Sequence, residues 1–259
     1  MAEAAWNTAV TSIAPNQIRV RGYRLDEMMG RVSFGEMVYL ILRGELPGER
    51  LGDLMEAMLV ASIDHGVTPP SALAVRNAAT TGAPLNACLA AGALAVNKHH
   101  GGAVEDCMHV LARGAAQVAA GASAADAAAE LIAEEKAAGR RLPGFGHRVH
   151  TDDPRSRRLL DLAREAGAAG AHIAVAEAIV AKLQAAGKAL PLNVDGAIAA
   201  VLADLAFNPD LANGFFILAR TAGWMAHVIE ERQRERPMRS IVQREAVYDG
   251  PAPRELPKP

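Results

Sequence analysis

The sequence predicts an all-α protein. Apolar residues recur at helical spacing over most of the chain, whereas aromatic residues make up only 4% of it and alternating runs of β-branched residues are short. The chain has 259 residues, of which 51% are hydrophobic, so it can bury a continuous core without disulfide or metal support. This length fits one large domain or two smaller ones.

Helical periodicity and punctuation by Gly and Pro define the expected helices. In chain order they are 34–43, 50–63, 71–81, 84–97, 101–118, 123–138, 154–166, 171–186, 195–206 and 210–233. The second helix carries an apolar stripe on one face, formed by Leu51, Leu54, Met55, Met58 and Leu59. The last helix has a similar stripe, formed by Leu211, Phe215, Leu218, Ala222, Met225 and Ile229. We expect both stripes to lie in a core.

Other segments also favour helix. The alanine-rich stretch 114–139 keeps a charged face, and alanine is the best helix former. Asp152, Asp153 and Pro154 supply acidic capping residues and a first-turn proline for the helix at 154–166. The segment 249–259, DGPAPRELPKP, is rich in proline, and we expect it to trail over the surface or to reach a neighbouring chain.

Composition excludes several classes of protein. The net charge of −2 gives no basic surface for nucleic acid, and no apolar run is long enough to cross a membrane. Cys88 and Cys107 lie in apolar helical segments and do not form a CxxC pair, so we expect neither a disulfide nor a metal site. The beginning of the sequence, MAEAAWNTAV, has no signal-peptide pattern. We therefore expect a cytoplasmic protein.

The segment 143–160, PGFGHRVHTDDPRSRRLL, concentrates glycine, histidine and arginine. The two glycines next to His147 would let the backbone approach a ligand closely. Arg155, in the first helical turn, offers a planar fork that suits a carboxylate. The alternative is that Arg155 pairs locally, for example with Asp152. The segment is consistent with a site for a small acid.

Three further histidines have both a functional and a structural interpretation. His65 ends a helix just before a glycine, where the helix dipole favours a histidine. His99 and His100 lie in a short loop that tolerates both. The glycine pair after them would instead let the N-terminus of the next helix approach a ligand.

Asp195 and Arg220 have similar alternatives. Asp195 begins a helix, where it either satisfies backbone donors or acts as a base facing a cleft. Arg220 interrupts an apolar stripe, so it is either exposed or a buried cation that requires an anion. Together, loop histidines, an aspartate and arginines indicate proton transfer on a substrate with several carboxylates.

These motifs resemble those of the citrate synthase superfamily from Arg21 to about Gly250. RGYRLDEMMGRVSFGEMVYLILRGELP is similar to the N-terminal signature, DHG to the loop of the first substrate histidine, and HHGGAVED to the acetyl-CoA histidine loop. GFGHRVHTDDPR is similar to the most diagnostic motif, and NVDG with ARTAGWMAHVIEERQRERP to the C-terminal half. The resemblance implies a single citrate synthase-like domain over 1–259, with a large helical subdomain at about 20–112 and 190–250 and a small one at 113–189.

The resemblance also implies catalytic roles. Asp195 would transfer the proton at the acetyl-CoA methyl carbon, and His100 would hydrogen-bond the thioester oxygen as it becomes an enol. His147 would bind the oxaloacetate carbonyl and move the proton of the product hydroxyl. The coenzyme A thioester would be a substrate, with no covalently bound cofactor.

Substrate-binding residues are implied in the same way. His65 would lie beside the catalytic groups, and Arg155, Arg220 and Arg236 would bind carboxylates. Arg239 and Arg244 are alternatives to Arg236 as the C-terminal ligand, which could come from a neighbouring subunit. Arg148 would bind coenzyme A. The resemblance thus implies a homodimer or a dimer of dimers.

One departure indicates the subtype. Only residues 48–63 separate the ELP signature from the DHG loop, where full-length citrate synthases have a large additional helical segment. This compact form resembles citryl-CoA lyases, including the C-terminal module of ATP-citrate lyase, although His100 is synthase-like. We expect cleavage of citryl-CoA to acetyl-CoA and oxaloacetate.

The sequence leaves other functions open. They are a citrate or 2-methylcitrate synthase, a non-catalytic acyl-CoA or dicarboxylate-binding protein, and a helical metal-dependent phosphohydrolase. The last lacks the adjacent His-Asp pair expected of that class.

Overall fold

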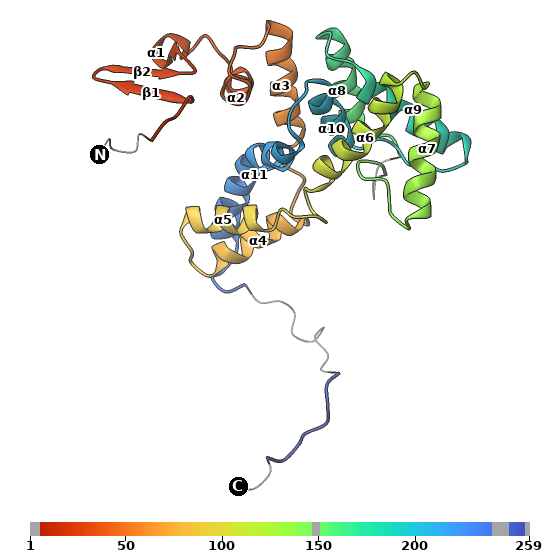
Figure 1. Cartoon of the computed structure of the whole chain (residues 1–259). Helices are drawn as coiled ribbons and strands as arrows, with labels where there is room; N and C mark the ends of the chain where they lie inside the picture. Colours follow the sequence, from red (N-terminus) through yellow and green to blue (C-terminus); the bar gives the residue numbers. More distant parts are fainter. Residues whose placement is uncertain (1–5, 147–150, 240–248, 257–259) are drawn as a thin grey trace, which may run out of the picture.

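The computed structural model describes residues 6–146, 151–239 and 249–256, and it is mainly helical, as the sequence predicts (Figure 1). Its helices are α1 Leu25–Met28, α2 Phe34–Arg43, α3 Glu49–Ala61, α4 Pro70–Thr80, α5 Leu85–Leu94, α6 Ala103–Ala119, α7 Ala124–Ala137, α8 Pro154–Glu165, α9 Ala171–Ala185, α10 Val194–Asp204, a 3-10 turn Pro209–Leu211, and α11 Ala212–Arg234. Each helix expected from the sequence is present, with its ends within one turn of the predicted positions.

A small antiparallel sheet near the N-terminus was not expected. Strands β1 Thr11–Ala14, β2 Gln17–Val20 and β3 Tyr23–Arg24 pair in that order. They are too short to show alternation, and the turn between the first two uses Asn16 in the left-handed region, with a φ of 60°. With α1 and α2 the sheet forms a small separate core around Val20, Met28 and Leu40, at one end of the molecule (Figure 1).

Helix α10 lies at the centre of the main core. It packs against α6, α8 and α9, and its residues 197–202 are all buried. Its sequence, VDGAIAAVLAD, is apolar on every face between its two aspartates, which is typical of a helix surrounded by others. Because its two acidic side chains, Asp195 and Asp204, lie in the first and last turns, this packing sets Asp195 at the edge of the core.

The second helical group contains α4, α5 and α11. Trp224 of α11 is 1% exposed and packs with Val75 and Cys88. A Cβ on Gly92 would lie 2.6 Å from the Val75 side chain and 3.0 Å from the Trp224 ring, so the close packing of α5 depends on that glycine. Helix α11 also contacts α3 and α6 and so joins the two groups.

The stripe predicted for α3 is buried, but the one predicted for α11 is largely not. Leu54, Met55 and Met58 are at most 2% exposed, whereas Leu218, Met225 and Ile229 are 39%, 40% and 47% exposed. The reason is that α11 turns a different face toward α3, α4 and α5, one that includes Gly223, Trp224 and His227. The prediction for α11 was therefore wrong within this chain.

Two further expectations concern the subdomains and the C-terminal segment. The division into large and small subdomains stays a prediction. Residues 249–256 have no regular structure and are exposed, and Figure 1 shows them away from the helical body. Within the described ranges, the helices lack the combination of length and apolarity that spanning a bilayer requires.

Candidate active site

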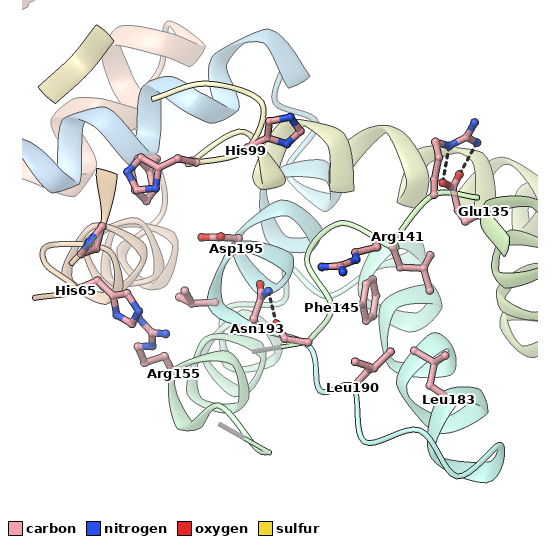
Figure 2. Close-up of a pocket in the computed structure, with 18 of the residues that line it drawn as sticks. His65, His99, Glu135, Arg141, Phe145, Arg155, Leu183, Leu190, Asn193 and Asp195 are labelled. Carbon is pink, nitrogen blue, oxygen red and sulfur yellow. Dashed lines mark hydrogen bonds and ion pairs between the residues drawn. The ribbon is translucent and has the colours of Figure 1, made fainter. Parts of the chain in front are cut away.

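A cavity of about 940 Å³ lies where segments distant in the sequence meet. The turn after α3 contributes His65, the loop before α6 contributes His99 and His100, and α10 and α11 contribute Asp195 and Arg220. Figure 2 shows His65 and Arg155 on one side of the cavity, Asp195 at its centre, and Arg141 and Phe145 on the other side. The volume suits a large organic ligand.

The start of α10 is fixed by Asn193. Its side-chain oxygen accepts a hydrogen bond from the Gly196 amide at 3.0 Å, which caps the helix, and its Nδ2 donates to the Gly146 carbonyl at 2.9 Å (Figure 2). The Asn193 side chain thus links the start of α10 to the glycine-rich loop at residues 143–146. Asp195, two residues further on, is held in the first helical turn.

Gly144 lets that loop lie directly on α10. Its φ is 81°, and an added Cβ would lie 2.7 Å from both the Gly196 Cα and the Cys107 sulfur. Only glycine tolerates this conformation and this contact. Burial raises the pKa of the Cys107 thiol, and the negative charge of Asp195 raises it further. Cys107 is therefore a neutral, structural neighbour of Asp195.

His100 is held inside the cavity wall. Its amide donates to the Asn97 carbonyl at 2.8 Å and its carbonyl accepts from the Asn97 amide at 2.8 Å, which forms a tight turn. The imidazole Nε2 lies 2.7 Å from the Ser71 hydroxyl oxygen in a hydrogen bond, and the ring contacts Phe216 edge to face. Burial, and then the charge of Arg220, lower the pKa of His100. Its imidazole is therefore mainly neutral at neutral pH.

His99 lies beside His100 at the tip of the same turn. It also lines the cavity, but its side chain is exposed (Figure 2). The two adjacent histidines therefore differ in burial. The His100 ring is a fixed hydrogen-bonding group, whereas the His99 side chain is solvated.

Arg220 is a buried cation, which decides between the two sequence interpretations. It is 5% exposed, its Nε donates to the Ser62 carbonyl at 2.8 Å, and its guanidinium lies 4.6 Å from the centre of the Phe216 ring. Burial lowers its pKa, while the charges of Asp64 and Asp195 oppose this effect. Among the described residues, no carboxylate forms an ion pair with it. Because it lines the cavity, an anionic ligand could neutralise it.

Arg155 lines the cavity but pairs locally. Its Nε and Nη2 donate to the two carboxylate oxygens of Asp153 at 3.0 and 2.9 Å. Burial alone would raise the pKa of the Asp153 carboxyl, yet the hydrogen bonds from Arg155 lower it below its ordinary value. Asp152, the partner considered from the sequence, pairs with Arg157 instead. The fork of Arg155 is therefore already engaged by a buried carboxylate.

Of the predicted site residues that the structure describes, Arg236 is the one that does not line the cavity. Arg236 is exposed and lies near Thr80, whose hydroxyl donates to the Arg236 carbonyl at 3.5 Å, and it does not line the cavity. His147 and Arg148 lie outside the described residues. Of the alternatives to Arg236, Arg239 donates to Glu231 at 2.7 Å and Arg244 lies outside the described residues.

Sequence reasoning missed a basic end of the cavity. Four cations line it, namely Lys136, Arg140, Arg141 and Lys188. The buried Glu135 accepts hydrogen bonds from Arg140 Nε and Nη2 at 2.8 and 3.0 Å (Figure 2). These bonds, and one from Arg113, lower the pKa of Glu135. The pair Arg140 and Arg141 directly precedes the glycine loop, and this adjacency was the available signal.

Apolar side chains also line the cavity. They are Ile132, Phe145, Leu183 and Leu190. The cavity therefore combines histidine, aspartate and arginine side chains with a group of further cations and an apolar lining. Within the described ranges, no three His, Cys, Asp or Glu side chains are arranged to hold a metal ion.

Comparison with known proteins is consistent with this geometry. Residues 48–241 match the sequence family described as "Citrate synthase, C-terminal domain". The chain belongs to the citrate synthase family. The match covers most of the chain, so the motifs interpreted from the sequence as citrate synthase-like are confirmed at the level of family.

Individual relatives refine the position within the citrate synthase family. The structure of citryl-CoA lyase from Hydrogenobacter thermophilus is 43% identical, with a TM-score of 0.87 and 98% of each chain covered. Citrate synthase from Haloferax volcanii is 30% identical over 77% of this chain but only 52% of its own length. This chain thus spans about half of the curated relatives it matches.

The fold extends to more distant proteins. ATP citrate lyase from Methanosaeta concilii, in complex with (3S)-citryl-CoA, has a TM-score of 0.81 at 21% identity, with 97% of this chain and 43% of that chain covered. The predicted citrate synthase-like helical fold is confirmed.

Proposed function

We propose that this chain is a citryl-CoA lyase that cleaves citryl-CoA to acetyl-CoA and oxaloacetate. The observation that carries the proposal is the match to the Hydrogenobacter thermophilus citryl-CoA lyase at 43% identity, in which 98% of both chains is covered. By contrast, the citrate synthase of Haloferax volcanii is about twice as long as the part that matches.

The cavity supports a coenzyme A thioester as substrate. The four cations at its basic end would bind phosphate oxygens of the coenzyme, while Ile132, Phe145, Leu183 and Leu190 would contact its apolar arm. Arg220 and His65 at the opposite end would bind the carboxylates of the citryl group. Glu135 would hold Arg140 in position for the phosphates.

Cleavage then requires two proton transfers. A base takes the citryl hydroxyl proton, and the electron pair of that O–H bond forms the oxaloacetate carbonyl as the carbon–carbon bond breaks. The resemblance assigns this base to His147. The electron pair of the broken carbon–carbon bond passes to the acetyl-CoA enolate, whose oxygen His100 stabilises. Protonated Asp195 then delivers a proton to the carbon that becomes the methyl group.

Incubation with citryl-CoA as the sole substrate tests the proposal. Chromatography should show acetyl-CoA and oxaloacetate in equal amounts. A citrate synthase is the second candidate, because the family relatives include citrate synthases. Formation of citrate and free coenzyme A by thioester hydrolysis would favour it, and no reaction would favour a binding protein.

We further propose that the protein is a homodimer or a dimer of dimers. The exposed apolar stripe of α11, formed by Leu218, Met225 and Ile229, supports an interface between two copies. Light scattering should give at least twice the monomer mass, and Met225→Glu should reduce it. A monomeric, fully active protein would contradict the proposal. A cytoplasmic location stays a prediction.

A further inference from the structure

The chain leaving α3 runs along one face of α11. Residues 62–64 each contact a different residue of that face, which is formed by Arg220, Gly223 and His227. Steps of three and four residues place these side chains on one side of a helix. Arg220 Nε donates to the Ser62 carbonyl at 2.8 Å, which fixes the first of the three contacts.

Gly223 makes the second contact possible. An added Cβ would lie 2.5 Å from the Ile63 carbonyl oxygen and 2.9 Å from a carboxylate oxygen of Asp64. The first of these atoms is backbone and cannot rotate away. A larger residue at 223 would therefore displace the turn that carries His65.

His227 makes the third contact. It is 8% exposed, and its Nε2 lies 3.0 Å from Asp64 Oδ1 in a hydrogen bond. The other Asp64 oxygen accepts from the Gly66 amide at 2.9 Å. The Asp64 carboxylate thus spans His65, because it is bonded to α11 on one side and to the residue after His65 on the other.

Charge keeps this arrangement intact at neutral pH. Burial alone would raise the pKa of Asp64, but the Gly66 amide and His227 lower it below its ordinary value. Glu230 also approaches His227, with 3.8 Å between the carboxylate oxygen and Nδ1. The imidazole therefore lies between two carboxylates and is hydrogen-bonded to that of Asp64.

We propose that Gly223 and His227 are positioning residues that fix the His65 turn and thereby set the orientation of the His65 imidazole in the cavity. The inference rests on the proposed function, in which His65 binds the carboxylated end of the substrate. Neither residue lines the cavity, so their effect must pass through Asp64 and the backbone of residues 62–66.

Four variants test this proposal. His227→Leu removes the hydrogen bond to Asp64, and His227→Gln retains a donor at a similar reach. Gly223→Ala introduces the steric conflict with Ile63. Gly214→Ala is the matched control on the same helix, because a Cβ there would have no heavy atom within 4 Å.

Steady-state kinetics with citryl-CoA provide the first measurement. We expect His227→Leu and Gly223→Ala to lower kcat/KM at least about tenfold, with coenzyme A affinity within about twofold of wild type. His227→Gln should recover most of the loss, and Gly214→Ala should match wild type. If Leu and Gln at 227 behave alike, or if coenzyme A binding falls in parallel, His227 acts only on stability and the proposal is overturned.

Imidazole NMR of His65, assigned with a His65→Gln variant, is independent of turnover. We expect its ring signals to shift in His227→Leu and to return toward wild type in His227→Gln. Unchanged signals would overturn the positioning role even if turnover fell. If the wild type does not cleave citryl-CoA, the proposed function fails, and the NMR comparison still decides the positioning role by itself.

Discussion

Replacing Arg155 by lysine separates stability from ligand binding. Arg155 donates through Nε and Nη2 to both oxygens of Asp153, whose side chain is fully buried. Lysine offers one ammonium in place of the planar fork. The Arg155 amide, which donates to Asp153 Oδ1 at 3.1 Å, does not depend on the side chain and is retained. The change therefore removes the partner of one buried carboxylate oxygen.

The expected loss of folding free energy follows from this one missing hydrogen-bond partner. A buried acceptor that loses its partner costs about 1–3 kcal/mol. For a chain of this size, each kcal/mol lowers the melting temperature by about 2–4 °C, so we expect a decrease on the order of 5 °C. The hydrogen bonds to Asp153 are the reason for this expected decrease. Because Arg155 also lines the cavity, we expect oxaloacetate affinity to fall about tenfold, or roughly 1.4 kcal/mol.

Differential scanning fluorimetry without ligand and calorimetry with oxaloacetate measure the two effects. Arg157→Lys is the control, because its pair with Asp152 is exposed and contributes little to stability. An unchanged melting temperature for Arg155→Lys would refute the structural argument. A lower melting temperature with unchanged oxaloacetate affinity would remove Arg155 from the binding site.

Three further changes have defined outcomes. The Asp195→Asn variant should fold and still bind oxaloacetate, but its turnover should fall about 10²–10⁴-fold, because an amide cannot exchange the proton. A variant that keeps more than half of the wild-type rate would exclude Asp195 as the acid. The His100→Ala variant should have a kcat about 10²–10³-fold lower, as expected for loss of a preorganised hydrogen-bond donor, and should retain its affinity for oxaloacetate. The His99→Ala variant should lose less kcat. Equal losses of kcat in the two variants would show that the role assigned to His100 is wrong. Asp204 accepts hydrogen bonds from His172 and neighbouring amides, which lower its pKa although burial opposes this. Its contribution to stability is therefore complete above the unfolded-state pKa of about 3.9 and is lost as the pH falls through the lower folded-state pKa. Asp204→Asn should lower the melting temperature at pH 7, and the difference from wild type should narrow below about pH 4; a constant difference would contradict the role of ionisation.

The helices could be predicted from the sequence because burial imposes a period of 3.6 residues on each of them. Helix α3 shows this directly, since its predicted stripe is the face that packs in the core. Strands β1 and β2 are four residues long, and so short an element leaves no periodic signal. Their pairing depends on the turn at Asn16, whose φ of 60° lies in the left-handed region.

The face that a helix buries was less predictable than the helix itself. In α11 the most apolar stripe is exposed, while Arg220 and His227 are buried. Hydrophobicity alone cannot identify the buried face when a polar residue has a partner in the fold, such as Asp64 for His227. Such partners lie far apart in the sequence.

The candidate site was predictable where a motif carries it and not elsewhere. His65, His100, Asp195 and Arg220 lie together around one cavity, as the resemblance implied. The basic end was missed, because its cations come from α7 and the loops after α7 and α9 and share no local pattern. The pairing of Arg155 with Asp153 was also missed. The residues of the segment DDPR suit both a helix cap and a ligand site, so the sequence does not distinguish the two.

Cleavage of citryl-CoA in D₂O tests the central claim most directly. Mass spectrometry at early time should show acetyl-CoA with one deuteron in its methyl group, together with an equal amount of oxaloacetate. The Asp195→Asn variant should form this product about 10²–10⁴-fold more slowly. Citrate and free coenzyme A without deuterated acetyl-CoA would contradict the account, because the carbon–carbon bond would then have remained intact.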